Sequence, residues 1–102
     1  MAEDLEQYLF SERVRQRLEM NVSEAEVNLL LWATREALEW NPKLRECTTE
    51  SWFRILLHCV VRDVDPLSER FQLVPWRDES EAGSPLEVKF AWEMELTTST
   101  TG

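Results

Sequence analysis

The stretch "NPKLRECTTESW", residues 41–52, joins the end of one helix to the start of the next. Pro42 disfavours helical geometry at the residue before it, so the preceding helix is predicted to stop there. Thr48 or Thr49 offers a hydroxyl that caps a new helix, and Glu50 lies beside the positive end of that helix. The junction therefore predicts two helices joined by a short link.

A capping box marks the start of the helix before the junction. Ser23 is followed three residues later by Glu26, and the two side chains can satisfy free amides at a helix start. The helix predicted from this point runs to about Trp40. Its middle, "VNLLLWA" from Val27 to Ala33, is apolar nearly all round. A helix of that kind is buried on more than one side, within the core or against another subunit.

Residues 3–20 form a further predicted helix, with apolar side chains recurring at helical spacing among charges. Ser11 interrupts this segment or caps its second part. Arg13, Arg15 and Arg17 alternate with other residues, so a helix spreads them over different sides. They are expected to be solvated surface rather than a binding patch.

The helix after the junction is apolar apart from one narrow polar stripe. Arg54, His58 and Arg62 follow one another at four-residue steps, which places them along one edge of a helix. The stripe has two interpretations: a row of donors that faces phosphates, or the one wetted edge of a buried helix. From these residues alone, the wetted edge is the economical interpretation.

Beyond Asp65 and Pro66, which mark a turn, the period of the apolar residues changes from helical to twofold. "RFQLVPW", residues 70–76, alternates, and its proline indicates a strand end or an edge strand. After a polar loop at residues 77–85, "LEVKFAWEMEL", residues 86–96, alternates cleanly and predicts a half-buried antiparallel strand. One face of that strand carries Leu86, Val88, Phe90, Trp92, Met94 and Leu96, and the other carries Glu87, Lys89, Ala91, Glu93 and Glu95.

These patterns predict an α+β fold in which three helices precede an antiparallel β-hairpin. A single small domain is expected over residues 1–96, and the patternless tail of residues 97–102 is expected to be disordered. A chain of 102 residues is long enough to bury one core without a metal or a disulfide.

The composition is typical of a cytoplasmic globular protein. Cys47 and Cys59 make no disulfide framework, and the chain opens without a signal-peptide pattern. No apolar run approaches the roughly 20 residues needed to cross a bilayer. We therefore expect two reduced thiols, a cytoplasmic location and no membrane contact.

The formal net charge of −9 opposes simple nucleic-acid binding, because affinity for phosphate comes mainly from Lys and Arg. The charge is uneven along the chain. Residues 1–42 carry four basic and nine acidic side chains, residues 43–77 carry six and five, and residues 78–102 carry one and six. Only the middle third, with a net charge of +1, is suited to facing a polyanion.

The sequence contains no pattern that indicates catalysis, a metal site or a cofactor. Its only glycines are Gly83 and Gly102, so it has neither a glycine-rich phosphate loop nor a G-x-S-x-G nucleophile elbow. The spacing of His58, Cys59 and Cys47 matches no familiar zinc arrangement. We expect no enzymatic activity from this chain.

Between Trp40 and Trp76 the order of features resembles the RecT family of phage single-strand annealing proteins. The family pattern is a helix ending in Asn-Pro-x-Leu, a Cys-Thr/Asp-x-x-Ser helix start, an apolar helix, a proline turn and a strand. The matching residues are Asn41, Pro42, Leu44, Cys47, Thr48, Ser51, Pro66, Leu73, Val74 and Pro75. Residues 4–19 look like the family's amino-terminal helix, and residues 86–94 look like the second strand of its hairpin.

The resemblance covers most of residues 4–94 and corresponds to the amino-terminal part of a longer family protein. It implies a helical segment followed by a β-hairpin, assembly into rings or filaments, and annealing of complementary DNA strands without nucleotide hydrolysis, metal or cofactor. This chain departs from the family in two places. "DPLSERF" stands where the family has a glycine-rich turn, and "AWEMELTT" replaces the Gly-Tyr-x-Gly end of the second strand.

Two functions compete on these observations. In the first, a RecT-like recombination module binds single-stranded DNA or assembles with annealing proteins, and its phosphate contacts are Arg54, Arg62, Arg70, Arg77 and Lys89. In the second, an acidic protein-binding module, such as a phage-type inhibitor or DNA mimic, acts on a basic nucleic-acid-processing partner, because charge complementarity speeds association and selects partners. A simpler third interpretation is a structural remnant that self-associates through its two apolar helices.

Overall fold

The structure is a computed structural model, and it describes residues 4–94. The described chain is a small compact α+β domain with a two-stranded antiparallel sheet, which confirms the predicted fold class. Four α-helices rather than three precede the hairpin, and a 3-10 helix, η1, occupies the predicted link. The elements in chain order are α1 (Leu5–Leu9), α2 (Glu12–Glu19), α3 (Glu24–Trp40), η1 (Pro42–Glu46), α4 (Thr49–Val61), β1 (Leu73–Trp76) and β2 (Glu87–Phe90).

The extra helix arises at Ser11, which divides the predicted first helix into α1 and α2. The Ser11 hydroxyl accepts a hydrogen bond from the Val14 backbone N–H at 3.4 Å and donates one to the Tyr8 carbonyl at 2.7 Å. A serine in this position satisfies a free amide at a helix start while ending the preceding turn. The interruption that the sequence left open is therefore a real break between two short helices.

The predicted start and end of α3 and the predicted start of α4 are confirmed. The Glu26 N–H donates to Ser23 Oγ at 3.2 Å at the start of α3, and the helix ends at Trp40. Thr48 rather than Thr49 caps α4, with its hydroxyl accepting from the Ser51 N–H at 3.2 Å. These bonds lie within three residues of each boundary, and such local chemistry is readable from sequence.

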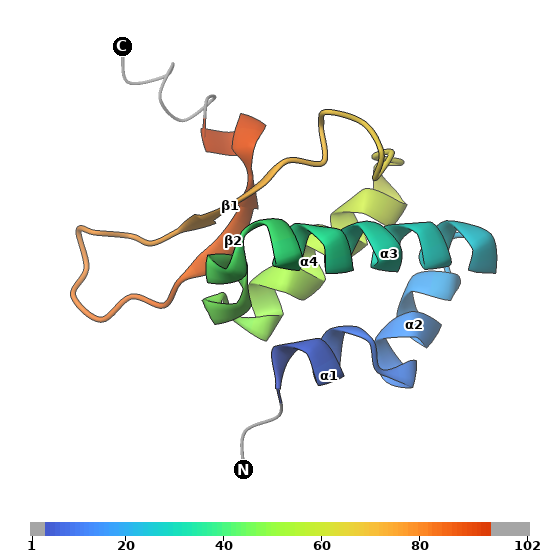
Figure 1. The fold of residues 1–102 in the computed structure, drawn as a ribbon, viewed down its shortest axis with the longest axis horizontal. Coiled ribbons are helices and arrows are strands. Elements are labelled where there is room, and N and C mark those ends of the chain that lie inside the picture. The colour runs from blue at the N-terminus through green and yellow to red at the C-terminus, as the bar shows by residue number, and fades with distance from the viewer. Residues whose placement is uncertain (1–3, 95–102) are drawn as a thin grey trace.

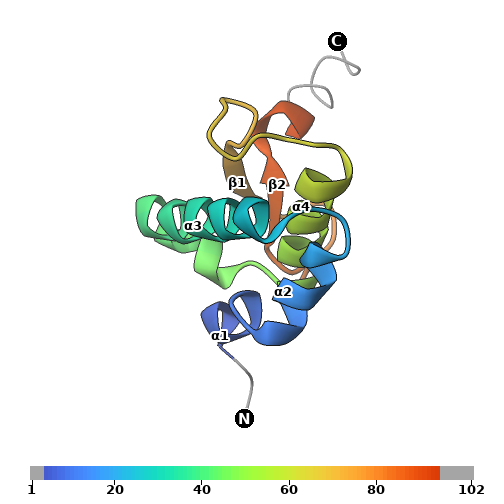
Figure 2. The same ribbon diagram turned by 90° about the vertical axis from the view of Figure 1, so that its right-hand side faces the viewer.

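Helix α4 lies at the centre of the molecule. Figures 1 and 2 both show α1 and α2 on one side of α4 and the two strands on the other. Trp52, on α4, is completely buried, and its ring N–H donates to the Leu44 carbonyl of η1 at 2.9 Å. The core around it is drawn from every helix and from β2, so this tryptophan is a structural anchor.

The strands pair antiparallel, with Leu73 opposite Phe90 and Trp76 opposite Glu87. Val88 and Phe90 are fully buried, which confirms the inward face predicted for the first part of the second strand. Pro75 lies opposite Val88, whose N–H points away from β1 to Ser51. Pro75 and Val88 therefore form a non-hydrogen-bonded pair of the ladder, so the missing N–H of the proline removes no hydrogen bond between the strands.

The prediction that the second strand continues beyond Phe90 is wrong. Residues 91–94 are helical instead, so the alternation of inward and outward side chains ends at Phe90. Trp92 nevertheless packs against the core, and Met94 is half-buried. The cause is a local capping interaction, in which Glu93 Oε1 accepts a hydrogen bond from the Phe90 N–H at 3.1 Å. The last residues of the predicted strand, residues 95 and 96, lie outside the described range.

Helix α3 is less buried than its apolar sequence predicts. Leu30 and Leu31 face the core, but Leu29 is 36% exposed and Trp32 is 53% exposed. Burial on more than one side within the core is therefore wrong, because no described segment covers this second face. The predicted tail of residues 97–102 lies outside the described residues. No helix in residues 4–94 is long and apolar enough to cross a membrane.

Candidate nucleic-acid interface

The polar edge of α4 is the base of the candidate site. Arg54 and Arg62 are exposed along this edge, and His58 lies half-buried between them. The opposite side of the helix packs Trp52, Ile55, Leu56 and Cys59 into the core. The polar edge therefore lies on the surface because the opposite side of the helix is packed in the core.

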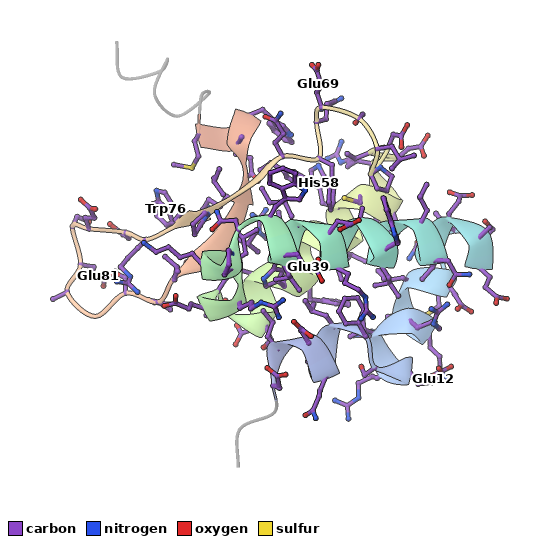
Figure 3. All side chains as sticks on the ribbon, in the orientation of Figure 1. Glu12, Glu39, His58, Glu69, Trp76 and Glu81 are labelled. Atoms are coloured by element: carbon purple, nitrogen blue, oxygen red, sulfur yellow. The ribbon has the colours of Figure 1, made fainter. Side chains whose placement is uncertain are left out.

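Aromatic side chains from β2 and the following turn cover His58. The His58 ring lies 5.2 Å from the Phe90 ring and 5.9 Å from the Trp92 ring, measured between centroids. Phe90 and Trp92 stack on each other at 5.3 Å with an angle of 15° between their planes. Figure 3 shows His58 near this end of the hairpin, with Trp76 well away from it. The helical turn after β2 thus brings Trp92 onto the polar edge of α4.

Two arginines join these rings from different parts of the chain. The guanidinium of Arg70, in the segment before β1, lies over the Trp92 ring at 5.5 Å from its centroid. Arg54 forms an ion pair with Glu93, at 3.4 Å between Nη2 and Oε1. We call Arg54, His58, Arg62, Arg70 and Trp92 the basic–aromatic cluster. Three arginines and one glutamate give this surface a local charge of about +2 while His58 is neutral.

The arginines of the cluster lie close enough to His58 to change its pKa. Burial lowers the pKa of His58 below its usual 6.5, and the nearby positive charges of Arg62, Arg54 and Arg70 lower it further. Glu93 opposes them by raising the pKa. At neutral pH the imidazole is therefore uncharged, and a bound anion would favour its protonation.

Trp92 also carries an unused hydrogen-bond donor. Its ring N–H is buried and has no acceptor among the described residues. A buried donor without a partner costs about 1–3 kcal/mol, so native structures usually satisfy one. The indole is therefore the polar group in the cluster that would gain most from an added acceptor.

Two of the five predicted phosphate contacts lie outside the cluster. The Lys89 ammonium lies 4.7 Å from the centroid of the Trp76 ring. Lys89 and Val74 are cross-strand partners, on the hairpin face turned away from Val88 and Phe90. Arg77 follows β1 and is exposed. The fold thus gathers Arg54, Arg62 and Arg70, whereas Lys89 lies on the outer face of the hairpin and Arg77 lies beyond the end of β1.

Sequence reasoning missed the parts played by Trp92 and Glu93, which it assigned to opposite faces of a strand. The only local signal was the glutamate three residues after Phe90, the spacing of a helix-capping acid. The clean alternation of apolar residues concealed this signal.

The described residues offer little for other chemistry. No group of three or more His, Cys, Asp or Glu side chains in residues 4–94 is arranged to hold a metal ion. Burial is the main cause that raises the pKa of the Cys47 thiol to about 11 and that of Cys59 to about 12. Neither thiol forms an appreciable amount of the nucleophilic thiolate at neutral pH.

Comparison with known proteins adds no further assignment. No protein-family model, no curated protein and no solved structure matches this chain.

Proposed function

We propose that this protein is a non-catalytic, RecT-like recombination module that binds single-stranded DNA through the basic–aromatic cluster. The supporting observation is that the charges of Arg54, Arg62 and Arg70 all act on His58 and that Arg70 lies over the Trp92 ring, although Arg70 and Trp92 come from segments outside α4. Arginines beside an aromatic ring suit single strands, since the guanidinium groups contact phosphates while bases stack on rings or guanidinium planes.

The acidity of the whole chain is compatible with this local site. Mobile ions screen exposed charges beyond about 8 Å at physiological ionic strength, so distant carboxylates act only weakly on the cluster. A site with three arginines nevertheless makes few phosphate contacts. We expect weak binding whose affinity depends on salt, with a slope of about −2 in a plot of log K against log salt concentration for single strands.

The test is fluorescence anisotropy of a labelled single-stranded oligonucleotide at several salt concentrations. Arg62→Gln and Arg70→Gln should each weaken binding and reduce the salt slope by about 0.7. Arg13→Gln, the same change at an exposed arginine on α2, is the matched control and should have no effect. Absence of binding at low salt, or equal losses in all three variants, would exclude this function.

The second candidate function is an acidic module that binds a basic nucleic-acid-processing protein. Its supporting observation is the exposure of Trp32 and Trp40, at 53% and 87%, on the acidic helix α3. Acidic side chains also lie at separate edges of the molecule, as Glu69 and Glu81 illustrate in Figure 3. Exposed tryptophans beside carboxylates are suited to anchoring a cationic partner.

A further inference from the structure

The face of α3 that the core leaves uncovered carries a stripe of large apolar side chains. Leu29, Trp32 and Trp40 are 36%, 53% and 87% exposed, and Leu67 of the loop opposite is 63% exposed. Only two other large apolar residues in the described range, Met20 and Val61, are as exposed. A concentration of this kind on one face marks an interaction surface.

Two hollows follow this face and meet at Pro66. The first, of about 330 Å³, lies between the amino-terminal half of α3 and the loop after α4. The second, of about 620 Å³, lies between the carboxy-terminal half of α3 and the segment that leads into β1, and both tryptophans border it. Together they form the α3 groove. Since α3 has 17 residues, the groove is about 25 Å long at 1.5 Å per residue.

Among the described residues, every charged side chain that lines the two hollows is acidic. These side chains are Glu26, Asp63 and Asp65 in the first hollow and Glu36 in the second. Arg35, the only basic residue of α3, lies instead over the Phe10 ring at 4.3 Å. The groove therefore combines an apolar floor with a negative rim.

We propose that the α3 groove binds a basic amphipathic helix of a partner protein. An apolar floor about 25 Å long fits a helix of four to five turns whose apolar side chains recur at i, i+3, i+4 and i+7. Lys and Arg on its flanks would meet the acidic rim, and the exposed tryptophans would be the anchors. The proposal deepens the second candidate function and rests on it.

Residues 4–94 of a second copy offer no such helix. Helix α2 is the most basic one, but it has only 8 residues, and a helix of that length covers about 12 Å. Its apolar residues Val14 and Leu18 are already buried, at 1% and 0% exposed. The occupant is therefore expected to come from another protein.

The test uses a labelled helical peptide of about 17 residues, the length of α3. It is built from Leu, Ala and Lys with its leucines on one face, and its control has the same composition in scrambled order. Fluorescence anisotropy with the full chain should show tight binding of the amphipathic peptide and weak binding of the scrambled one.

Substitutions then locate the bound peptide. Trp32→Ala combined with Trp40→Ala should weaken binding about tenfold or more, since interface tryptophans are frequent hot spots. Met20→Ala removes an apolar side chain that is 81% exposed outside the groove, and it should leave affinity unchanged. All three side chains are largely solvated, so the variants should remain folded, and circular dichroism verifies this.

Charge reversal distinguishes the groove from the acidity of the whole surface. Glu36→Lys, in the groove, should weaken peptide binding strongly, whereas Glu81→Lys, in the hairpin loop, should have little effect. Equal losses from both would overturn the groove while keeping the acidic-module function. If neither peptide binds at low salt, the groove proposal and the acidic-module function are both excluded.

Two further outcomes would overturn the proposal. The tryptophan variant could bind the peptide as tightly as the unaltered chain, which would place the peptide elsewhere. Alternatively, the chain alone could sediment as a dimer that Trp40→Ala separates, which would identify a second copy as the occupant. Arg62→Gln should leave peptide binding intact, so this assay is independent of the DNA proposal.

Discussion

Ser51 holds the hairpin against α4, and its substitution gives the sharpest test of how the fold positions the candidate site. Its hydroxyl accepts the Val88 N–H at 3.1 Å and donates to the Thr48 carbonyl at 2.9 Å. The Thr48 N–H also donates to the Leu86 carbonyl at 3.0 Å. The first turn of α4 therefore supplies the hydrogen bonds that the free edge of β2 lacks.

Ser51→Ala should lower the free energy of unfolding by about 2 kcal/mol. Val88 is fully buried, and a buried N–H left without an acceptor costs about 1–3 kcal/mol. The Thr48 carbonyl adds little, because it still accepts the Trp52 N–H at 3.2 Å. A loss of about 2 kcal/mol raises the ratio of unfolded to folded protein about 30-fold.

Urea denaturation followed by tryptophan fluorescence measures this loss. Ser84→Ala is the control, since the Ser84 hydroxyl donates only to the solvent-exposed carbonyl of Glu81, and it should change stability by less than about 0.5 kcal/mol. The Val88 amide should also exchange its hydrogen faster in Ser51→Ala. A change below about 0.5 kcal/mol in Ser51→Ala would refute the assigned role of this hydroxyl.

Three further predictions follow from buried groups. Because burial keeps the pKa values of Cys47 and Cys59 near 11 and 12, a thiol reagent at about pH 8 should label neither in the folded chain and both after unfolding. The pKa of His58 is lowered below 6.5, so protonating it favours unfolding, and stability should fall as the pH drops through the range below 6.5. His58→Gln should show a smaller fall over that range in urea titrations. Trp52→Phe should lose about 2 kcal/mol in the same assay, because it removes the bond to the Leu44 carbonyl and leaves a cavity.

Helix boundaries were the part of the fold most readable from sequence. Ser23 and Thr48 cap the helices that they were predicted to start, and Pro42 ends the helix before it. Each of these effects operates within three or four residues of chain, so no distant contact overrides it. The buried face of the second strand was also predictable up to Phe90, since alternation reports burial wherever the strand persists.

The candidate site was predictable only in part. The four-residue spacing of Arg54 and Arg62 is enough to place them on one edge of a helix. No sequence spacing reveals that Arg70 lies over Trp92, because the two residues are 22 positions apart in the sequence and the hairpin lies between them. No local pattern in the sequence indicates either that Lys89 lies outside the basic–aromatic cluster.

Short segments of the sequence were enough to predict helices followed by an antiparallel hairpin, since capping, proline geometry and apolar period are properties of neighbouring residues. Which residues remain on the surface became known only from the packing of distant segments. That packing turned Trp92 onto the edge of α4 and left Trp32 and Trp40 uncovered on α3. Exposure depends on which distant segments fill the space beside a side chain, and the local pattern of a helix or strand does not contain that information.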